Sequence, residues 1–261
     1  RKGKTMDNER KFALLIDADN ISPKYLMVML AEAKRYGNVT IRRIYGDWTD
    51  NSKKTWKDNL LDYSIVPIQQ YSYTTGKNSS DSAMIIDAMD ILYSNVIDGF
   101  ILVSSDSDFT RLAMRLREAG KTVIGMGEAK TPSAFVKACE EFKTLDVLFK
   151  NTLSTEEQKE VLETTEDETS NDISDVAPIT EIGEIKKCIL SILDEHSDEN
   201  GRMLLSELGR LLTKEYPDFD ERNYGKYKKF SQFVQKLSGC EIDMVYFEGE
   251  NKPPLAYVKT K

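Results

Sequence analysis

The stretch Phe12-Ala-Leu-Leu-Ile-Asp-Ala-Asp-Asn20 decides the fold, because its apolar run leads directly into two carboxylates and an amide. An uninterrupted apolar run of this length is typical of a strand that is buried on both faces of a parallel sheet. Phe100-Ile-Leu-Val103 repeats the arrangement and is followed by Ser-Ser-Asp106-Ser-Asp108. Ligands of open parallel sheets bind beyond the carboxyl ends of the strands, so these acids are expected to converge on one site.

The rest of the first 149 residues alternates strand and helix patterns. Further strands are expected at 39–45, 65–68 and 122–126, and helices at Pro23–Tyr36, Ser79–Tyr93 and Phe109–Ala119. This alternation predicts an α/β fold with a Rossmann-like parallel sheet. The sequence holds neither a GxGxxG nor a GxxxxGK[ST] motif, so the dinucleotide and P-loop classes lack their phosphate-binding loop.

A third acidic position is Asp81, which ends the run Gly76-Lys-Asn-Ser-Ser-Asp81 near the start of the third helix. Taken alone, Asp81 is better explained as a first-turn acid that favours the helix dipole. Together with the two strand-end groups it places several negative charges at one point. Crowded carboxylates repel one another and need compensation, and oxygen-rich sites suit Mg²⁺ or Mn²⁺.

The neighbours of these acids allow more than one interpretation. Asn20 can hold a water, a phosphate oxygen or the start of a helix, and Asp19 is expected to be a helix-start charge or a supporting group. One of Asp106 and Asp108 is expected to cap the following helix, while Ser105 can donate to a phosphate or to a carboxylate. Lys77, with Tyr71 and Tyr73, lies in the loop before Asp81, where it can contact a phosphate or simply face solvent.

Composition excludes several kinds of chemistry. His196 is the one histidine, so no Ser-His-Asp triad can be built in residues 1–150. Three cysteines lie far apart and in no metal-binding spacing, which indicates thiols in a reducing compartment and a cytoplasmic location. No stretch approaches the ~20 apolar residues of a membrane span. Residues 151–180 hold nine acids and one lysine, and so account for the whole net charge of −8.

Three regions follow from these patterns: a first domain at 11–149, an acidic flexible linker at 150–180 and a second domain at 181–261. The second domain is expected to hold helices near 182–193, 204–216 and 222–237, then a hairpin of 242–247 with 255–259. Three helices and a terminal hairpin predict a small winged helix-turn-helix, with the third helix as the recognition helix.

Three motifs in order, Leu-Leu-Ile-Asp17-Ala-Asp-Asn20, Gly-Lys-Asn-Ser-Ser-Asp81 and Val-Ser-Ser-Asp106-Ser-Asp108-Phe, resemble the NYN domain, closest to its LabA-like branch in the PIN/FLAP nuclease group. Ile44-Tyr-Gly-Asp47-Trp48 is also similar to this branch. The resemblance implies a metal-dependent nuclease that acts most often on RNA. It implies Asp17, Asp81 and Asp106 as metal-binding acids, with Asn20 and Asp108 in support.

Residues 181–261 are similar to the OST-HTH (LOTUS) domain, a module associated with RNA, through the run Asn223-Tyr-Gly-Lys-Tyr-Lys-Lys-Phe. Residues 222–236 carry five basic side chains and no acid, which is typical of a phosphate-binding surface. RNA is therefore the expected partner, and a protein partner of this module is left open. The expected contacts are Arg222, Tyr224, Lys226, Lys228 and Lys229, with a solvated face of lysines as the alternative.

Three functions compete on the sequence. The first is a Mg²⁺- or Mn²⁺-dependent ribonuclease whose second domain recruits RNA. The second is an aspartate-based phosphatase of the haloacid dehalogenase type, which the Asp17-Ala-Asp19 spacing fits but Asn20-Ile21 and Asp81 do not. The third is a non-catalytic RNA-binding or regulatory protein on a nuclease fold, because a fold alone does not establish an activity.

Overall fold

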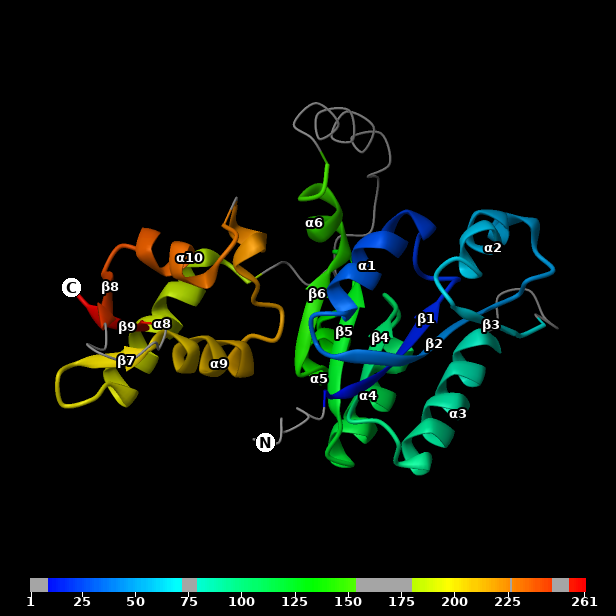
Figure 1. Cartoon of the computed structure of the whole chain (residues 1–261), viewed down its shortest axis with the longest axis horizontal. Helices are drawn as coiled ribbons and strands as arrows, with labels where there is room; N and C mark the ends of the chain where they lie inside the picture. The colour runs from blue at the N-terminus through cyan, green and yellow to red at the C-terminus, as the bar shows by residue number, and fades with distance from the viewer. Residues whose placement is uncertain (1–8, 72–78, 154–179, 226, 246–253) are drawn as a thin grey trace, which may run out of the picture. The chain divides into compact units, whose positions relative to one another are not determined.

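Two separate units make up the chain, Arg1–Ala177 and Pro178–Lys261 (Figure 1). The computed structural model describes residues 9–71, 79–153, 180–225, 227–245 and 254–261, without the side chains of Ser79 and Ser80. The expected acidic linker therefore lies outside the described residues from 154 to 179. Each unit is described by itself.

The first unit is built on a six-stranded sheet in which every strand pair is parallel, with the order β3-β2-β1-β4-β5-β6. This arrangement confirms the predicted α/β fold class. Strand order reverses between β1 and β4, so this pair forms the switch point at which ligands of open sheets bind. The strands are β1 Lys11–Asp17, β2 Asn38–Gly46, β3 Val66–Gln69, β4 Gly99–Val103, β5 Thr122–Gly127 and β6 Glu141–Thr144.

Helices cover both faces of this sheet. Their bounds are η1 Pro23–Tyr25, α1 Leu26–Ala33, η2 Asn51–Lys53, α2 Lys54–Leu60, α3 Ser79–Ser94, η3 Ser107–Phe109, α4 Thr110–Glu118, α5 Ser133–Ala138 and α6 Leu145–Lys150. The short elements β6, α2, α5 and α6 were not expected from the sequence, because four to seven residues carry too little periodicity to distinguish them.

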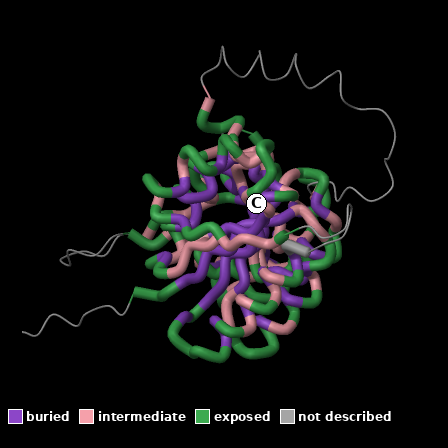
Figure 2. Tube along the Cα trace, turned by 90° about the vertical axis from the view of Figure 1, so that its right-hand side faces the viewer, coloured by how far each residue is buried: buried purple, intermediate pink, exposed green. Residues whose placement is uncertain are grey.

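Alternation along β1 explains why its sequence is apolar throughout. Phe12, Leu14 and Ile16 pack into one core with α1, α2 and α6, whereas Ala13 and Leu15 pack into a second core with α3, α4 and α5. Successive strand side chains point to opposite faces, so a strand covered on both sides must be apolar at every position. Figure 1 shows α1 and α3 on opposite sides of the sheet, and Figure 2 shows the buried segments of the chain in purple.

The second unit packs three helices against a three-stranded sheet of order β7-β9-β8, with antiparallel pairs. This unit confirms the small helical and β domain that the sequence predicts. Its elements are α8 Ile182–His196, β7 Arg202–Leu204, α9 Leu205–Glu215, η4 Glu221–Tyr224, α10 Phe230–Lys236, β8 Cys240–Val245 and β9 Leu255–Thr260.

The prediction of one continuous third helix over 222–237 is wrong. The structure has the short turn η4, a break at Gly225 and then the seven-residue α10. Gly225 has φ +133° and ψ −155°, a backbone conformation that is open only to glycine. Lys229 is also extended, with φ −144° and ψ 141°. The basic residues of 222–236 therefore do not share one helix.

Candidate metal centre

Asp17 is the last residue of β1, and only 1% of it is exposed. Its Oδ1 accepts hydrogen bonds from the backbone N–H groups of Asp19, at 3.0 Å, and Asn20, at 3.2 Å. Its Oδ2 accepts from Asn20 Nδ2 and from Ser104 Oγ, each at 2.8 Å. Burial raises the pKa of Asp17, and these four hydrogen bonds oppose that shift. Asn20 thus fixes the orientation of the Asp17 carboxylate.

Ser104 joins the ends of the two central strands. It is fully buried, and besides donating to Asp17 its Oγ accepts from the N–H of Asp106 at 3.0 Å. A Cβ on Gly127 of β5 would lie 2.6 Å from the Ser104 carbonyl oxygen, so only glycine leaves room for this close approach. The hydrogen bond to a carboxylate that was expected of Ser105 is made by Ser104, and the Ser105 Oγ accepts from the N–H of Glu128 at 2.9 Å.

The strand register explains the role of Ser104 and could have identified it. Ile16 pairs with Val103, so the next step along both strands sets Asp17 beside Ser104. Leu15 and Leu102, two residues earlier in each strand, belong to the core that faces α3. Because side chains alternate with a period of two, Asp17 and Ser104 belong to the α3 face. Asp81 lies in the first turn of α3 and thus on that same side of the sheet.

Asp81 is the least satisfied polar residue of the centre. It is 5% exposed, and its Oδ1 is buried without a hydrogen-bond partner among the described residues. Burial raises the pKa of Asp81 to about 7, and the negative charges of Asp17, Asp106 and Asp108 add to this shift. A buried carboxylate oxygen without a donor is costly, so this atom calls for a cation.

Asp106 and Asp108 complete an acidic cluster with Asp81. One carboxylate oxygen from each of the three lies within 4.8 Å of the others. Asp106 also caps η3, since its Oδ1 accepts from the N–H of Asp108 at 2.9 Å. Asp106 is therefore both the cap of η3 and a member of the cluster, two roles that were expected to be alternatives. Asp108, which was expected in a supporting role, is thus a member of this cluster. The group of three does not include Asp17, both of whose carboxylate oxygens already accept hydrogen bonds.

The donor set of this cluster fits a hard divalent cation. All donors are carboxylate oxygens, and one of them lacks any donor partner among the described residues. Mg²⁺ and Mn²⁺ prefer such ligands. Asp17, Asn20 and Ser104 form the framework beside them.

Two of the expected RNA-contacting residues of the second unit, Arg222 and Tyr224, have partners within that unit. Arg222 is paired with Asp220 at 2.6 Å. The Tyr224 ring stacks on Phe219 with centroids 5.8 Å apart, and its hydroxyl donates to the Thr180 carbonyl. Lys228 and Lys229 are exposed just before α10. Lys226, like Lys77 in the first unit, lies outside the described residues.

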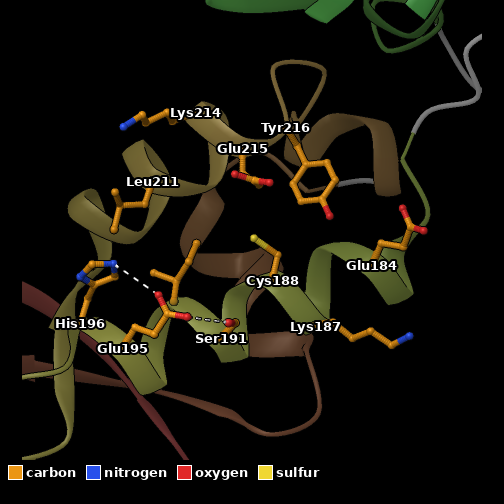
Figure 3. A pocket seen from close by; sticks show the side chains of 11 residues that line it. Glu184, Lys187, Cys188, Ser191, Glu195, His196, Leu211, Lys214, Glu215 and Tyr216 are labelled. Atoms are coloured by element: carbon orange, nitrogen blue, oxygen red, sulfur yellow. Dashed lines mark hydrogen bonds and ion pairs between the residues drawn. The ribbon is translucent and has the colours of Figure 1, made fainter.

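The second unit also holds a surface cavity of about 700 Å³ between α8 and α9 (Figure 3). Its walls include Cys188, Glu215, Tyr216 and His196, whose Nε2 lies 4.0 Å from a Glu195 carboxylate oxygen. Burial, and to a smaller extent the neighbouring acids, raise the pKa of the Cys188 thiol, which therefore stays protonated. The volume of this cavity does not make it the reactive centre, because the convergent carboxylates lie in the other unit.

The parallel α/β sheet with an acidic cluster at its switch point defines a PIN-like α/β protein. Comparison with known sequences identifies the family. The NYN domain model matches residues 11–146, and the chain belongs to the NYN family, which has a PIN-like nuclease fold. The OST-HTH/LOTUS domain model matches residues 181–245, and domains of this kind bind RNA. Both matches confirm the resemblance seen in the sequence.

Individual relatives add little about activity. An uncharacterised protein of Methanocaldococcus jannaschii is 26% identical over 130 residues, which are 48% of this chain and 51% of that protein. The chain thus spans about half the length of this relative. A crystal structure of a protein of unknown function from Vibrio parahaemolyticus is 19% identical with a TM-score of 0.44, covering 54% of this chain and 96% of that one. Among the described residues, no helix is long and apolar enough to span a membrane.

Proposed function

We propose that the chain is a Mg²⁺- or Mn²⁺-dependent ribonuclease whose second unit recruits the RNA. The observation that carries this proposal is the buried Oδ1 of Asp81, which has no hydrogen-bond partner among the described residues and lies in a cluster of carboxylates at the strand-order switch point. Membership of the NYN family supports a nuclease, and the OST-HTH domain supports RNA as the substrate class.

Each residue of the centre has a proposed role. Asp81, Asp106 and Asp108 are the proposed ligands of the ion, because one oxygen of each lies within the same 4.8 Å cluster. Asp17, which the family resemblance implies as a further metal-binding acid, is proposed to support them from the end of β1, since both of its oxygens already accept hydrogen bonds. Asn20 and Ser104 hold the Asp17 carboxylate in place through their 2.8 Å hydrogen bonds. Asp106 holds the start of η3 while it faces the cluster.

The proposed reaction is hydrolysis of a phosphodiester by in-line displacement. The oxygen of a water forms a bond to phosphorus as the bond to the leaving ribose oxygen breaks, and the proton lost by the water balances the one that the leaving oxygen gains. A divalent ion, when bound, makes the water more acidic and neutralises charge on the phosphate. The chain supplies the carboxylates that hold the ion. In the second unit Lys228 and Lys229, with Lys226, are the proposed phosphate contacts.

Cleavage of labelled RNA by the full chain tests this function. We expect cutting with Mn²⁺ or Mg²⁺, none with a chelator, and at least about a tenfold loss of rate and of Mn²⁺ affinity in Asp106→Asn. Asp90→Asn is a matched control, since Asp90 is an exposed acid on α3 and loses the same charge. Cutting that survives the chelator would overturn the proposal.

The same experiment addresses the non-catalytic alternative, which the OST-HTH match favours as an RNA-binding function. Structured and unstructured RNA are both offered, and binding is followed alongside cleavage. RNA that is bound but stays intact with either ion would establish a binding or regulatory protein on a nuclease fold.

A further inference from the structure

A lysine lies next to the metal centre without belonging to any of the motifs that predicted it. The Nζ of Lys53, at the end of η2, is 2.6 Å from Asp19 Oδ1. It also donates to the Ala18 carbonyl at 2.8 Å. Only 12% of the Lys53 side chain is exposed, against 39% for Asp19. Both contacts are made with the turn that directly follows Asp17, so this lysine is bound to the backbone beside the site.

The surroundings of Lys53 hold it in this position. Asp50 caps η2 by accepting from the Ser52 N–H at 2.8 Å, which fixes the short turn on which Lys53 lies. The aliphatic stem of the lysine lies over the end of β2, since a Cβ on Gly46 would be 3.8 Å from Lys53 Cε and 3.2 Å from the Ala18 side chain. The Ala18 N–H donates to the Tyr45 carbonyl at 3.0 Å. The turn after β1 is therefore held by hydrogen bonds to Lys53 and to the Tyr45 carbonyl.

Asp19 borders the metal centre, because it follows Asp17 by two residues and its N–H donates to Asp17 Oδ1 at 3.0 Å. Its charge is among those that raise the pKa of Asp81. A carboxylate in this place could turn toward a bound cation and compete with Asp81, Asp106 and Asp108. The ion pair with Lys53 instead engages the Asp19 oxygen at short range, where a charge-assisted hydrogen bond is strongest.

We propose that Lys53 is a positioning residue of the metal centre, which engages Asp19 and so keeps this carboxylate out of the ligand set of Asp81, Asp106 and Asp108. This inference rests on the proposed metal-dependent function and extends it, because it states which acid near the ion is not a ligand. Lys53 acts through Asp19 and does not touch the ion.

Calorimetric titration of the full chain with Mn²⁺ tests the assignment. Lys53→Met removes the positive charge but keeps the unbranched stem, and so releases the Asp19 carboxylate. This variant is expected to bind Mn²⁺ about five- to tenfold more tightly, which is the size of effect of one partly exposed carboxylate beside a divalent ion. In an Asp19→Asn background, Lys53→Met is expected to leave Mn²⁺ affinity unchanged. Lys54→Met is the matched control, because Lys54 is the next residue and is exposed.

Asp19→Asn alone gives a second test that does not depend on how Lys53→Met folds. It is expected to bind Mn²⁺ within about twofold of wild type, as one charge already paired contributes little. A tenfold loss, as in Asp106→Asn, would make Asp19 a ligand and overturn the assignment. Unchanged affinity in Lys53→Met would overturn it too, whereas a wild-type chain that binds no Mn²⁺ would overturn the proposed function itself.

Discussion

At the scale of single residues, Asp81 is where function and stability oppose each other. Its carboxylate is buried among like charges, and its Oδ1 lacks a donor among the described residues. Such an arrangement destabilises the metal-free fold and becomes favourable only with a cation present. The acid is therefore expected to reduce stability in the chain that it equips for metal binding.

Asp81→Asn should accordingly raise the melting temperature of the first unit in the presence of a chelator at pH 8. A rise of a few degrees is expected, since ~1 kcal/mol corresponds to about 2–4 °C in a domain of this size. The same variant should lose the stabilisation that Mn²⁺ gives to wild type. Differential scanning calorimetry measures both, and Asp90→Asn serves as the control with the same change of charge.

The pH dependence of this effect has a defined sign. The pKa of Asp81 is raised from 3.8 to about 7, so the folded chain holds a proton there that the unfolded chain releases. Wild type should lose stability relative to Asp81→Asn as the pH rises from about 4 to about 7, with no further change above. Melting curves with chelator at pH 4 and pH 8 test this. An equal gap between the two proteins at both pH values would contradict it.

At the scale of elements, the break between η4 and α10 depends on Gly225. Its φ of +133° lies where L side chains are rarely found, although a Cβ there would meet only ordinary contacts with the Tyr227 ring at 3.5 Å. Backbone strain is thus the expected cost of Gly225→Ala, about 1–3 kcal/mol of unfolding free energy in the second unit. Gly183→Ala is the control, because the same type of substitution should there increase the unfolding free energy.

Gly183 is an exposed position of α8 where a Cβ would meet nothing within 4 Å. Replacing it with alanine should stabilise the second unit by about 0.5–1 kcal/mol, because alanine is the better helix former. Denaturant unfolding followed by circular dichroism compares the two variants. If Gly225→Ala is as stable as wild type, the backbone at this position does not require glycine.

This break also shows why the second unit was harder to predict than the first. Phe230, Phe233, Val234 and Leu237 have helical spacing, and a pattern of apolar residues does not reveal where a helix starts. The runs 12–16 and 100–103 were predicted correctly, because strands buried on both faces carry an uninterrupted apolar signal. Residues 141–144 form an edge strand of four residues, too few for any periodicity to emerge.

The metal centre was predictable in part for a related reason. Asp17, Asp106 and Asp108 follow strands whose ends must meet in a parallel sheet, so their convergence follows from topology. Ser104 needed the strand register, which no single strand specifies. Lys53 reaches Asp19 from a separate 3-10 turn, and no local pattern encodes such a contact.

At the scale of the whole molecule, binding of RNA and cutting of RNA are expected to be separable. Changing Lys226, Lys228 and Lys229 together to glutamate should weaken binding of single-stranded RNA by the full chain regardless of its sequence, because phosphate contacts position and do not specify. Each lost contact should reduce the log–log salt slope by about 0.7. Fluorescence anisotropy at several salt concentrations measures both quantities.

Turnover of a short RNA at saturating concentration should stay unchanged in the same triple variant, since the carboxylate cluster lies in the other unit. Lys186, Lys187 and Lys214 offer a control triple with the same charge reversal on α8 and α9. Equal loss of RNA binding in both triples would indicate a general charge effect and not a contact surface before α10.

The pairing of β1 with β4 has a consequence for how the chain can be divided. Asp17 ends β1 and Asp106 follows β4, with β2, β3 and α3 between them in the chain. The centre is therefore assembled from distant parts of the polypeptide and has no local precursor. A short excised peptide or a grafted loop would carry the acids without bringing them together. The smallest fragment that would keep these acids together is therefore the entire sheet with the helices that cover it.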